Sequence, residues 1–503
     1  MKSRKKTAQK TGVLVLAGIL CVGSLMGCSN NSGEEEYLGE NIEDVQLFAA
    51  SDAGYVGDPM PFYEDGEFHI FYLLDKRDGS NGYHPWALYN TENFYEYEDC
   101  GEVIPYADSL NAQDIALGTG SVIKDEDGMY HAFYTGHNDT YSPKEAIMHA
   151  TSKDMKDWTK LPEDTFSANA HYSQNDFRDP YVLYMEEENE YWMLITTRNE
   201  KTGIIAKYTS KDLKQWKDEG TFFVNDMDTD SNMECPTLLQ YQGKWYLTFS
   251  DQWPMREFHY RVSDTPDGKF EIPKQDIIDG NGFYAGRLET DGENLYAFGW
   301  NATKVDHLDE EEYDWGGNLV VHQLVQKEDG SLVPIMNASV KEGMKKELSL
   351  TPLRMTETIE KHKRDYELSG KEYEVVEFNT LLGSYRFETT IKNFKNSEKF
   401  GFAFQTDDEA VGAMNIVFDV KENKIEFFNT NELYAMDPQS EIDIDFENLE
   451  ELKVSMMIAD GVVSMYVDEQ CAMTARMYAS QGGTWGMFGI NSNVCFEDVR
   501  IYK

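Results

Sequence analysis

The feature that most constrains the fold of this chain is a hairpin-like phrase that recurs five times. Each copy has a short apolar run, a turn with glycine or polar residues, and a run of aromatic and β-branched residues. Two runs joined by a tight turn form a β-hairpin. The second runs are EDGEFHIFYL (64–73), EDGMYHAFYT (126–135), EENEYWMLIT (187–196), YQGKWYLTFS (241–250) and TDGENLYAFG (290–299), and their starts are 62, 61, 54 and 49 residues apart.

Another phrase follows several hairpins and links a third run to a fourth. ATSKDMKDW (150–158) and YTSKDLKQW (208–216) are close copies of it, and YNTENFYEY (89–97) is a looser one. Four strands repeated five times, at intervals of about 50–60 residues, indicate a five-bladed β-propeller. We expect it over residues 45–344. A solenoid or stacked sandwiches would have similar spacing.

The pattern changes after residue 345. Alternating strand segments follow, such as SYRFETTIKNF (384–394), NIVFDVKENKIEFF (415–428) and LKVSMMIADGVVSMYVDE (452–469). This period of two indicates an antiparallel β-sandwich over residues 345–503, expected to cover the flank of the propeller. The predicted fold is therefore all-β, a five-bladed β-propeller followed by a C-terminal β-sandwich.

Three acidic residues take equivalent positions in this repeat. Asp58, Asp179 and Glu234 each come at the start of the first strand of a blade, in blades one, three and four. First strands line the central channel of a propeller and begin at one end of it, so we expect the three carboxylates to converge. Asp437 also precedes a proline but lies outside the repeat.

Clustered acids in a channel can hold a hard cation, exchange protons, or bind the hydroxyls of a sugar. No loop of closely spaced calcium ligands is evident, and Cys100, Cys235, Cys471 and Cys495 lack metal-site spacing. We therefore predict no metal and no cofactor. Separately buried thiols are favoured over a Cys471–Cys495 disulfide, which an oxidising exterior would permit.

Glycoside cleavage needs one carboxyl that protonates the leaving oxygen and a second that attacks the anomeric carbon or activates water. A third acid that stays ionised can hold ring hydroxyls. Arg178 would favour ionised Asp179 if both side chains point the same way, which strand alternation argues against. Aromatic residues expected near the mouth, which could stack on a sugar, are Phe62, Trp86, Trp253 and Tyr284.

The N-terminus predicts export. Basic residues between Lys2 and Lys10 precede an apolar run at 13–26 that is short for a membrane span and fits a signal peptide. The run ends in Leu25-Met26-Gly27-Cys28, which resembles the lipobox of bacterial lipoproteins, where the cysteine carries the lipid. We expect a signal over 1–28, a polar tether over 29–44, and a protein held outside the bacterial cell membrane by lipid on Cys28. A signal peptide with a chance cysteine is the alternative. The net charge of −46 makes nucleic acid a poor partner.

The chain resembles family 32 glycoside hydrolases, the invertase, levanase and inulinase family, over about residues 50–503. GDPMPF matches the motif of the family nucleophile and implies Asp58 in that role, FRDPYV implies Asp179 as transition-state stabiliser, and MECPTL implies Glu234 as acid/base. GTGSV (118–122) and FYAGRLE (283–289) match further family segments. The resemblance implies a fructan-like oligo- or polysaccharide substrate. With the three acids, we predict that Arg178, Trp86, Ser121 and Tyr284 contact it.

The departures from the family pattern fall in the sugar pocket. Gly57 stands where the family has asparagine, Met60-Pro61 where it has asparagine-glycine, and Leu73 where glutamine is usual. His84-Pro85-Trp86 only loosely matches another pocket motif. Because these positions normally contact the terminal fructose, we expect the chemistry to be kept and the sugar recognition to be altered.

Three hypotheses follow. The first is a retaining hydrolase of β-fructofuranosides or a related furanoside. The second is an inverting arabinan- or xylan-active hydrolase resembling family 43, which shares the propeller and three acids. The third is a surface lipoprotein that binds glycans without cleaving them.

Overall fold

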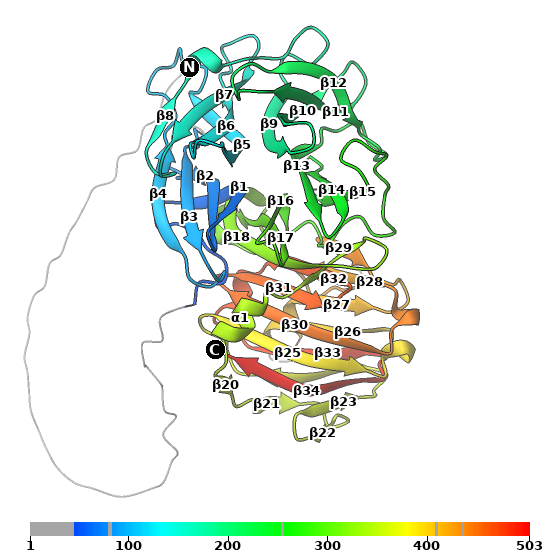
Figure 1. Cartoon of the computed structure of the whole chain (residues 1–503). Coiled ribbons are helices and arrows are strands. Elements are labelled where there is room, and N and C mark those ends of the chain that lie inside the picture. Colours follow the sequence, from blue (N-terminus) through cyan, green and yellow to red (C-terminus); the bar gives the residue numbers. More distant parts are fainter. Residues whose placement is uncertain (1–44, 79–82, 253–255, 408–410, 435) are drawn as a thin grey trace, which may run out of the picture. The chain divides into compact units, whose positions relative to one another are not determined.

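The computed structural model describes residues 45–503, apart from 79–82, 253–255, 408–410 and 435. The regular structure in these residues is almost all β-strand, numbered β1–β34 in Figure 1, and confirms the predicted propeller followed by a sandwich. The helical segments are α1 (Ala338–Gly343) and the 3₁₀ turns Pro162–Asp164, Val305–His307, Phe394–Asn396, Phe446–Asn448 and Tyr478–Ser480. No helix among the described residues is long and apolar enough to cross a membrane.

The first three blades are four-stranded antiparallel sheets in chain order. Blade one contains β1 (Tyr55–Glu64), β2 (Glu67–Asp75), β3 (Trp86–Thr91) and β4 (Glu98–Ile104). Blade two contains β5 (Ala116–Lys124), β6 (Tyr130–His137), β7 (Glu145–Ser152) and β8 (Trp158–Lys160). Blade three contains β9 (Phe177–Met185), β10 (Glu190–Arg198), β11 (Gly203–Ser210) and β12 (Lys217–Val224).

The last two blades depart from this plan. Blade four contains β13 (Glu234–Tyr241), β14 (Lys244–Ser250) and β15 (Phe258–Ser263), with two isolated bridges, Val262–Glu271 and His259–Ile277, in place of the predicted fourth strand. Pro266 and Pro273 occupy this outer segment, and proline cannot donate to a ladder. Blade five contains β16 (Tyr284–Thr290), β17 (Leu295–Lys304), β18 (Tyr313–Gln326) and β19 (Leu332–Ile335), and β18 pairs with β1, so the ring closes.

The recurring phrases form the expected turns. Asp65-Gly66 and Gln242-Gly243 are two-residue hairpin loops in which both residues have positive φ, the geometry that fits the twist of paired strands. In the second phrase, Asp154 and Asp212 each accept hydrogen bonds from two backbone N–H groups. Asn93 does the same in the looser copy.

A β-bulge interrupts the first strand of every blade. Two residues of each inner strand lie opposite one residue of the neighbouring strand and are left out of the pairing. The unpaired residues are Asp58-Pro59, Gly118-Thr119, Asp179-Pro180, Cys235-Pro236 and Ala285-Gly286. A bulge bends its strand and redirects side chains that strict alternation would place on opposite faces.

The C-terminal sandwich consists of two sheets. One has the order β22-β23-β34-β25-β30-β31-β32 with β20 on β34, and the other has the order β21-β24-β33-β26-β27-β28-β29. Their strands are β20 (Glu347–Leu348), β21 (Pro352–Met355), β22 (Glu360–His362), β23 (Asp365–Leu368), β24 (Tyr373–Phe378), β25 (Tyr385–Lys392), β26 (Lys399–Thr406), β27 (Gly412–Asp419), β28 (Lys424–Phe428), β29 (Ser440–Asp443), β30 (Glu451–Ala459), β31 (Val462–Val467), β32 (Cys471–Arg476), β33 (Trp485–Ile490) and β34 (Val494–Tyr502). The described cysteines Cys100, Cys235, Cys471 and Cys495 are free, and the last two are buried, so the conceivable Cys471–Cys495 disulfide is not formed.

Buried polar contacts fasten the sandwich to blade five. Arg476 on β32 is almost fully buried and donates to the carbonyls of Asn301 and Ala302 on β17. The carboxylate of Asp279 accepts from the backbone N–H of Thr474 at 2.7 Å. Charge-assisted hydrogen bonds of this kind, shielded from water, give the two parts of the chain a defined register.

Candidate active site

A cavity of about 340 Å³ lies where the first strands of the blades begin. Asp58, Asp179 and Glu234 all line it, so the structure brings the three predicted acids together. Residues 116–119 of blade two and Tyr284 and Ala285 of blade five also line it, as does a further acid, Glu145. This volume is within the range of small-molecule sites, about 300–1,000 Å³, and suits a sugar ring.

The three acids are not in the same register, contrary to the sequence prediction. Asp58 and Asp179 are both the first unpaired residue of their bulge, whereas Glu234 comes one residue earlier and pairs with Ser250. The blade-four equivalent of Asp58 is Cys235. Because the bulge breaks strand alternation, consecutive residues face the cavity together, and the acid of blade four reaches it from the preceding position.

Asp58 is held by a donor on each carboxylate oxygen. Thr119 donates its hydroxyl to Oδ2 at 2.7 Å, and Trp300 donates its indole N–H to Oδ1 at 3.0 Å. Burial raises the pKa of Asp58, and the nearby charge of Glu234 adds to the rise. The two hydrogen bonds oppose it by favouring the ionised form. They also fix the orientation of the carboxylate within the cavity.

Glu234 receives three hydrogen bonds. Arg178 donates to Oε1 at 2.6 Å, Gln252 donates to the same oxygen at 3.1 Å, and the Tyr284 hydroxyl donates to Oε2 at 2.7 Å. Tyr284 also packs edge-on against Trp300, with ring centroids 5.6 Å apart. Since Trp300 donates to Asp58 and Tyr284 donates to Glu234, the hydrogen-bond donors of the two carboxyls pack against each other.

Asp179 is the most enclosed of the three acids, with 5% of its surface exposed. Burial raises its pKa to about 7, although Arg178 Nε, 3.9 Å from Oδ2, favours the carboxylate. The charge of Glu234 adds to the rise, and the backbone N–H of Cys235, 3.1 Å from Oδ2, opposes it. Burial thus opposes the ionised state that the sequence leads us to expect of a third acid, while Arg178 favours it.

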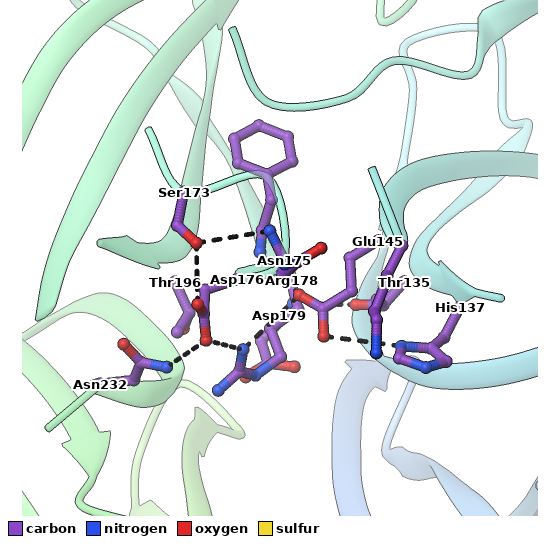
Figure 2. A network of polar contacts seen from close by, with 12 residues as sticks. Thr135, His137, Glu145, Ser173, Asn175, Asp176, Arg178, Asp179, Thr196 and Asn232 are labelled. Atoms are coloured by element: carbon purple, nitrogen blue, oxygen red, sulfur yellow. Dashed lines mark hydrogen bonds and ion pairs between the residues drawn. The ribbon is translucent and has the colours of Figure 1, made fainter. Parts of the chain in front are cut away.

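Arg178 faces the same side as Asp179, which the sequence argued against on strand alternation. The bulge after Arg178 removes that constraint. Figure 2 shows how the guanidinium is fixed: Nη1 lies 3.2 Å from Asp176 and 3.5 Å from Glu145. Asn232 donates to the same Asp176 oxygen, and His137 lies 3.7 Å from Glu145. Arg178 thus lines the cavity as predicted and joins two of its acids.

Two residues predicted to contact the substrate do not line the cavity. Trp86 is fully buried, donates its indole N–H to the Gly118 carbonyl at 3.0 Å, and is not part of the cavity wall. Ser121 is buried between blades, where it donates to the Pro180 carbonyl and accepts from the Val182 N–H. Both side chains stabilise the sheets around the site. Phe62 packs against Tyr130 away from the cavity, and Trp253 lies outside the described residues.

The aromatic wall is made by residues that sequence reasoning did not single out for this role. His84 and Trp315 line the cavity and stack with centroids 4.0 Å apart. A Cβ built on Gly57 would lie 2.2 Å from Trp315, so the glycine is required by that ring. Trp315 begins the segment WGGNLVVHQL (315–324), which also resembles a family 32 segment and was the available signal. Thr119 belongs to the GTGSV motif, from which the sequence prediction chose Ser121 instead.

A five-bladed propeller with three carboxyls around one sugar-sized cavity has the architecture of a glycosidase. Residues 49–334 match the model described as "Glycosyl hydrolases family 32 N-terminal domain". Residues 340–501 match "GH32, BT1760-like, C-terminal domain". The chain belongs to glycoside hydrolase family 32, and the family 43 alternative is set aside.

Relatives of known activity are distant. A sucrose-6-phosphate hydrolase of Vibrio alginolyticus is 24% identical over 42% of this chain and 45% of its own length. A levanbiose-producing levanase of Bacillus subtilis (strain 168) is 27% identical over 38% of this chain and 37% of its own length. The chain therefore spans less than half the length of either relative. The structure of fructan 1-exohydrolase IIa from Cichorium intybus is similar with a TM-score of 0.71 and 14% identity, over 91% of this chain and 96% of that one.

Proposed function

We propose that the protein hydrolyses β-fructofuranosides, or a closely related furanoside, with retention of the anomeric configuration. The observation that carries the proposal is the convergence of Asp58, Asp179 and Glu234 on one cavity. Membership of family 32 supports it. The relatives named above are hydrolases of sucrose 6-phosphate, levan and fructan, and we infer a fructan-like oligo- or polysaccharide as the substrate.

In the first step, a carboxylate oxygen of Asp58 attacks the anomeric carbon of the furanose. The bond from this carbon to the leaving oxygen breaks, and Glu234 gives its proton to that oxygen. In the second step, Glu234 takes a proton from water, whose oxygen attacks the same carbon and releases Asp58. Two inversions give net retention, which requires the two carboxyls to be about 5–5.5 Å apart.

The contacts of Glu234 suit a group that alternates between acid and base. A tyrosine hydroxyl can donate or accept, so Tyr284 can bind either the ionised or the protonated form of Oε2. Arg178 favours the carboxylate that remains after the first step. Asp179 would hold ring hydroxyls, and these hydrogen bonds strengthen as positive charge develops on the ring.

The wall beside Asp58 supports an altered sugar pocket. Where the family has an asparagine side chain, Gly57 leaves space that the Trp315 ring fills. Leu73 and the stacked His84 also face the cavity. We infer that this wall holds its sugar mainly by contact with ring faces, which suits the apolar face of a carbohydrate.

The test measures sugar release by the purified protein from sucrose, inulin, levan, arabinan and xylan oligomers, beside an Asp58→Asn variant. Fructose released by the wild type and lost in the variant supports the proposal. Release of arabinose or xylose would reject the substrate class. No release from any substrate, together with glycan binding, would favour the non-catalytic alternative.

We also propose that the mature protein is anchored outside the cell by lipid on Cys28, a residue outside the described part of the structure. The lipobox-like sequence at 25–28 supports this proposal. Expression in a bacterial host with a radiolabelled fatty acid should label the wild type and leave Cys28→Ala unlabelled. Equal labelling of both would refute the assignment.

A further inference from the structure

A second cluster of polar groups lies beside the cavity, where β14 ends and β15 begins. Asp251, Glu257 and His259 each offer one ligand atom, and the three atoms lie within 4.8 Å of one another. Asp251 and His259 are buried, and Glu257 is half-buried. The proposed catalytic chemistry uses none of them.

His259 has an unusual hydrogen-bonding arrangement for a buried imidazole. Its Nδ1 lies 3.0 Å from Asp276 Oδ2, and Arg261 holds the same carboxylate oxygen at 2.5 Å. Because ionised Asp276 can only accept, Nδ1 carries the proton and Nε2 of the neutral ring carries a lone pair. Nε2 is buried and has no hydrogen-bond partner among the described residues.

This free nitrogen points toward the two acids. Glu257 Oε2 is the nearest charged atom to it, at 3.8 Å, which is too long for a hydrogen bond. Asp251 accepts from the Glu257 backbone N–H at 2.8 Å, which holds these two acids next to each other. Histidines that bind metal commonly donate their other ring N–H to a carboxylate, as His259 does to Asp276.

Carboxyls outnumber the cations around the cluster, where Arg256 is close enough to Asp251 to interact with its charge. Asp251, Glu257 and Asp276 bring three carboxyls together, and Arg261 divides its charge between Asp276 and Asp226. A dication would balance the remaining negative charge and occupy the lone pair of Nε2. An imidazole ligand disfavours calcium and magnesium, which select oxygen, and two carboxylates disfavour copper(I), which selects sulfur.

We propose that Asp251, Glu257 and His259 bind a divalent transition-metal ion, with zinc as the best-fitting probe. Three protein ligands and a water complete the tetrahedral coordination that zinc prefers. The sequence analysis predicted no metal, since the ligands are spaced as Asp-x₅-Glu-x-His and match no familiar motif. The one sequence signal was that Glu257 and His259 are two residues apart at the start of β15, since side chains two residues apart on a strand point to the same face.

The ion would also position Gln252, which donates a hydrogen bond to Glu234. Gln252 follows Asp251 directly, donates to Glu234 Oε1 at 3.1 Å and accepts from the Asn232 N–H at 3.1 Å. Fixing Asp251 would hold Gln252 in place. This effect on catalysis rests on the proposed function, whereas metal binding does not.

The test uses the full chain, dialysed against a chelator and then titrated with Zn²⁺, with bound metal measured by elemental analysis. We expect one zinc per chain with a Kd of about 1 μM or tighter, and a Tm rise of roughly 2–5 °C at a hundredfold excess over Kd. Glu257→Gln and His259→Gln should each weaken binding at least about tenfold and remove the Tm shift. Glu257 is half-buried, so its variant should fold.

His69→Gln is the matched control. His69 is another buried histidine; it lies on β2, far from the cluster in sequence, and its Nδ1 is 2.9 Å from Asn90 Oδ1. It should bind zinc like the wild type. The proposal would be overturned if the wild type bound no zinc, or if Glu257→Gln and His259→Gln bound zinc as tightly as the wild type does. Either result would count whether or not the protein cleaves sugars. Preferential binding of Ca²⁺ would overturn the assigned metal class.

Discussion

Replacing Asp179 with asparagine should stabilise the protein more at high pH than at low pH. The folded state raises the pKa of Asp179 from 3.8 to about 7, chiefly by burial. A group whose folded pKa lies above its unfolded pKa favours folding most below the unfolded value. Its contribution is lost as pH rises through the folded value. Asparagine carries no charge at any of these pH values and lacks this dependence.

The size of the effect follows from the two pKa values. The difference between 3.8 and about 7 corresponds to about 4 kcal/mol at about 1.4 kcal/mol per pH unit. Because the charge of Glu234 contributes to the raised pKa of Asp179, we expect the free energy of unfolding of Asp179→Asn to gain about 2–4 kcal/mol over the wild type between pH 4 and pH 8. The interaction of the carboxylate with Arg178 is already part of the pKa of about 7, so its loss in the amide is included in this figure.

The assay is equilibrium unfolding in guanidinium chloride at five pH values from 4 to 8. Asp437→Asn is the matched control, because Asp437 also precedes a proline but is exposed and lies outside the site. Its difference from the wild type should stay constant with pH. A difference for Asp179→Asn that is flat, or that grows as pH falls, would show that burial does not dominate the ionisation of this carboxyl.

Three further variants test the rest of the site. Glu234→Gln should lower kcat/KM by about 10²–10⁴ on a natural substrate and by less on a substrate whose leaving group needs no protonation. An equal loss on the two substrates would argue against acid catalysis by Glu234. Trp300→Phe removes a hydrogen bond that lowers the pKa of Asp58, so the acidic limb of the kcat/KM profile should move to higher pH. Trp192→Phe should not move it. Ser121→Ala should lower the free energy of unfolding by about 1–3 kcal/mol and leave kcat unchanged. A large rise in KM at unchanged stability would instead indicate that Ser121 contacts the substrate.

The repeat made the fold and the convergence of acids predictable, since hairpin turns such as Asp65-Gly66 are local signals with local causes. The bulges were not predictable, because the pairing partner of an inner strand decides them. Their absence from the prediction explains two errors: the register of Glu234 and the direction of Arg178. The placement of Trp86 and Ser121 outside the cavity wall was not predictable, because a motif reports position in the chain and cannot tell an inward side chain from one between blades.

The bent inner strands influence which amino acids can serve the cavity. Asp58, Asp179, Cys235 and Ala285 have φ between 44° and 57°, a left-handed conformation that aspartate and asparagine tolerate better than most residues. The backbone thus favours a carboxylate at these positions before any substrate is considered. Ala285 holds the same conformation in the cavity wall without that compensation. An aspartate there would add one more acid to Asp58, Glu145, Asp179 and Glu234 with less backbone strain, so new chemistry could be introduced at blade five at a position outside the strand ladder.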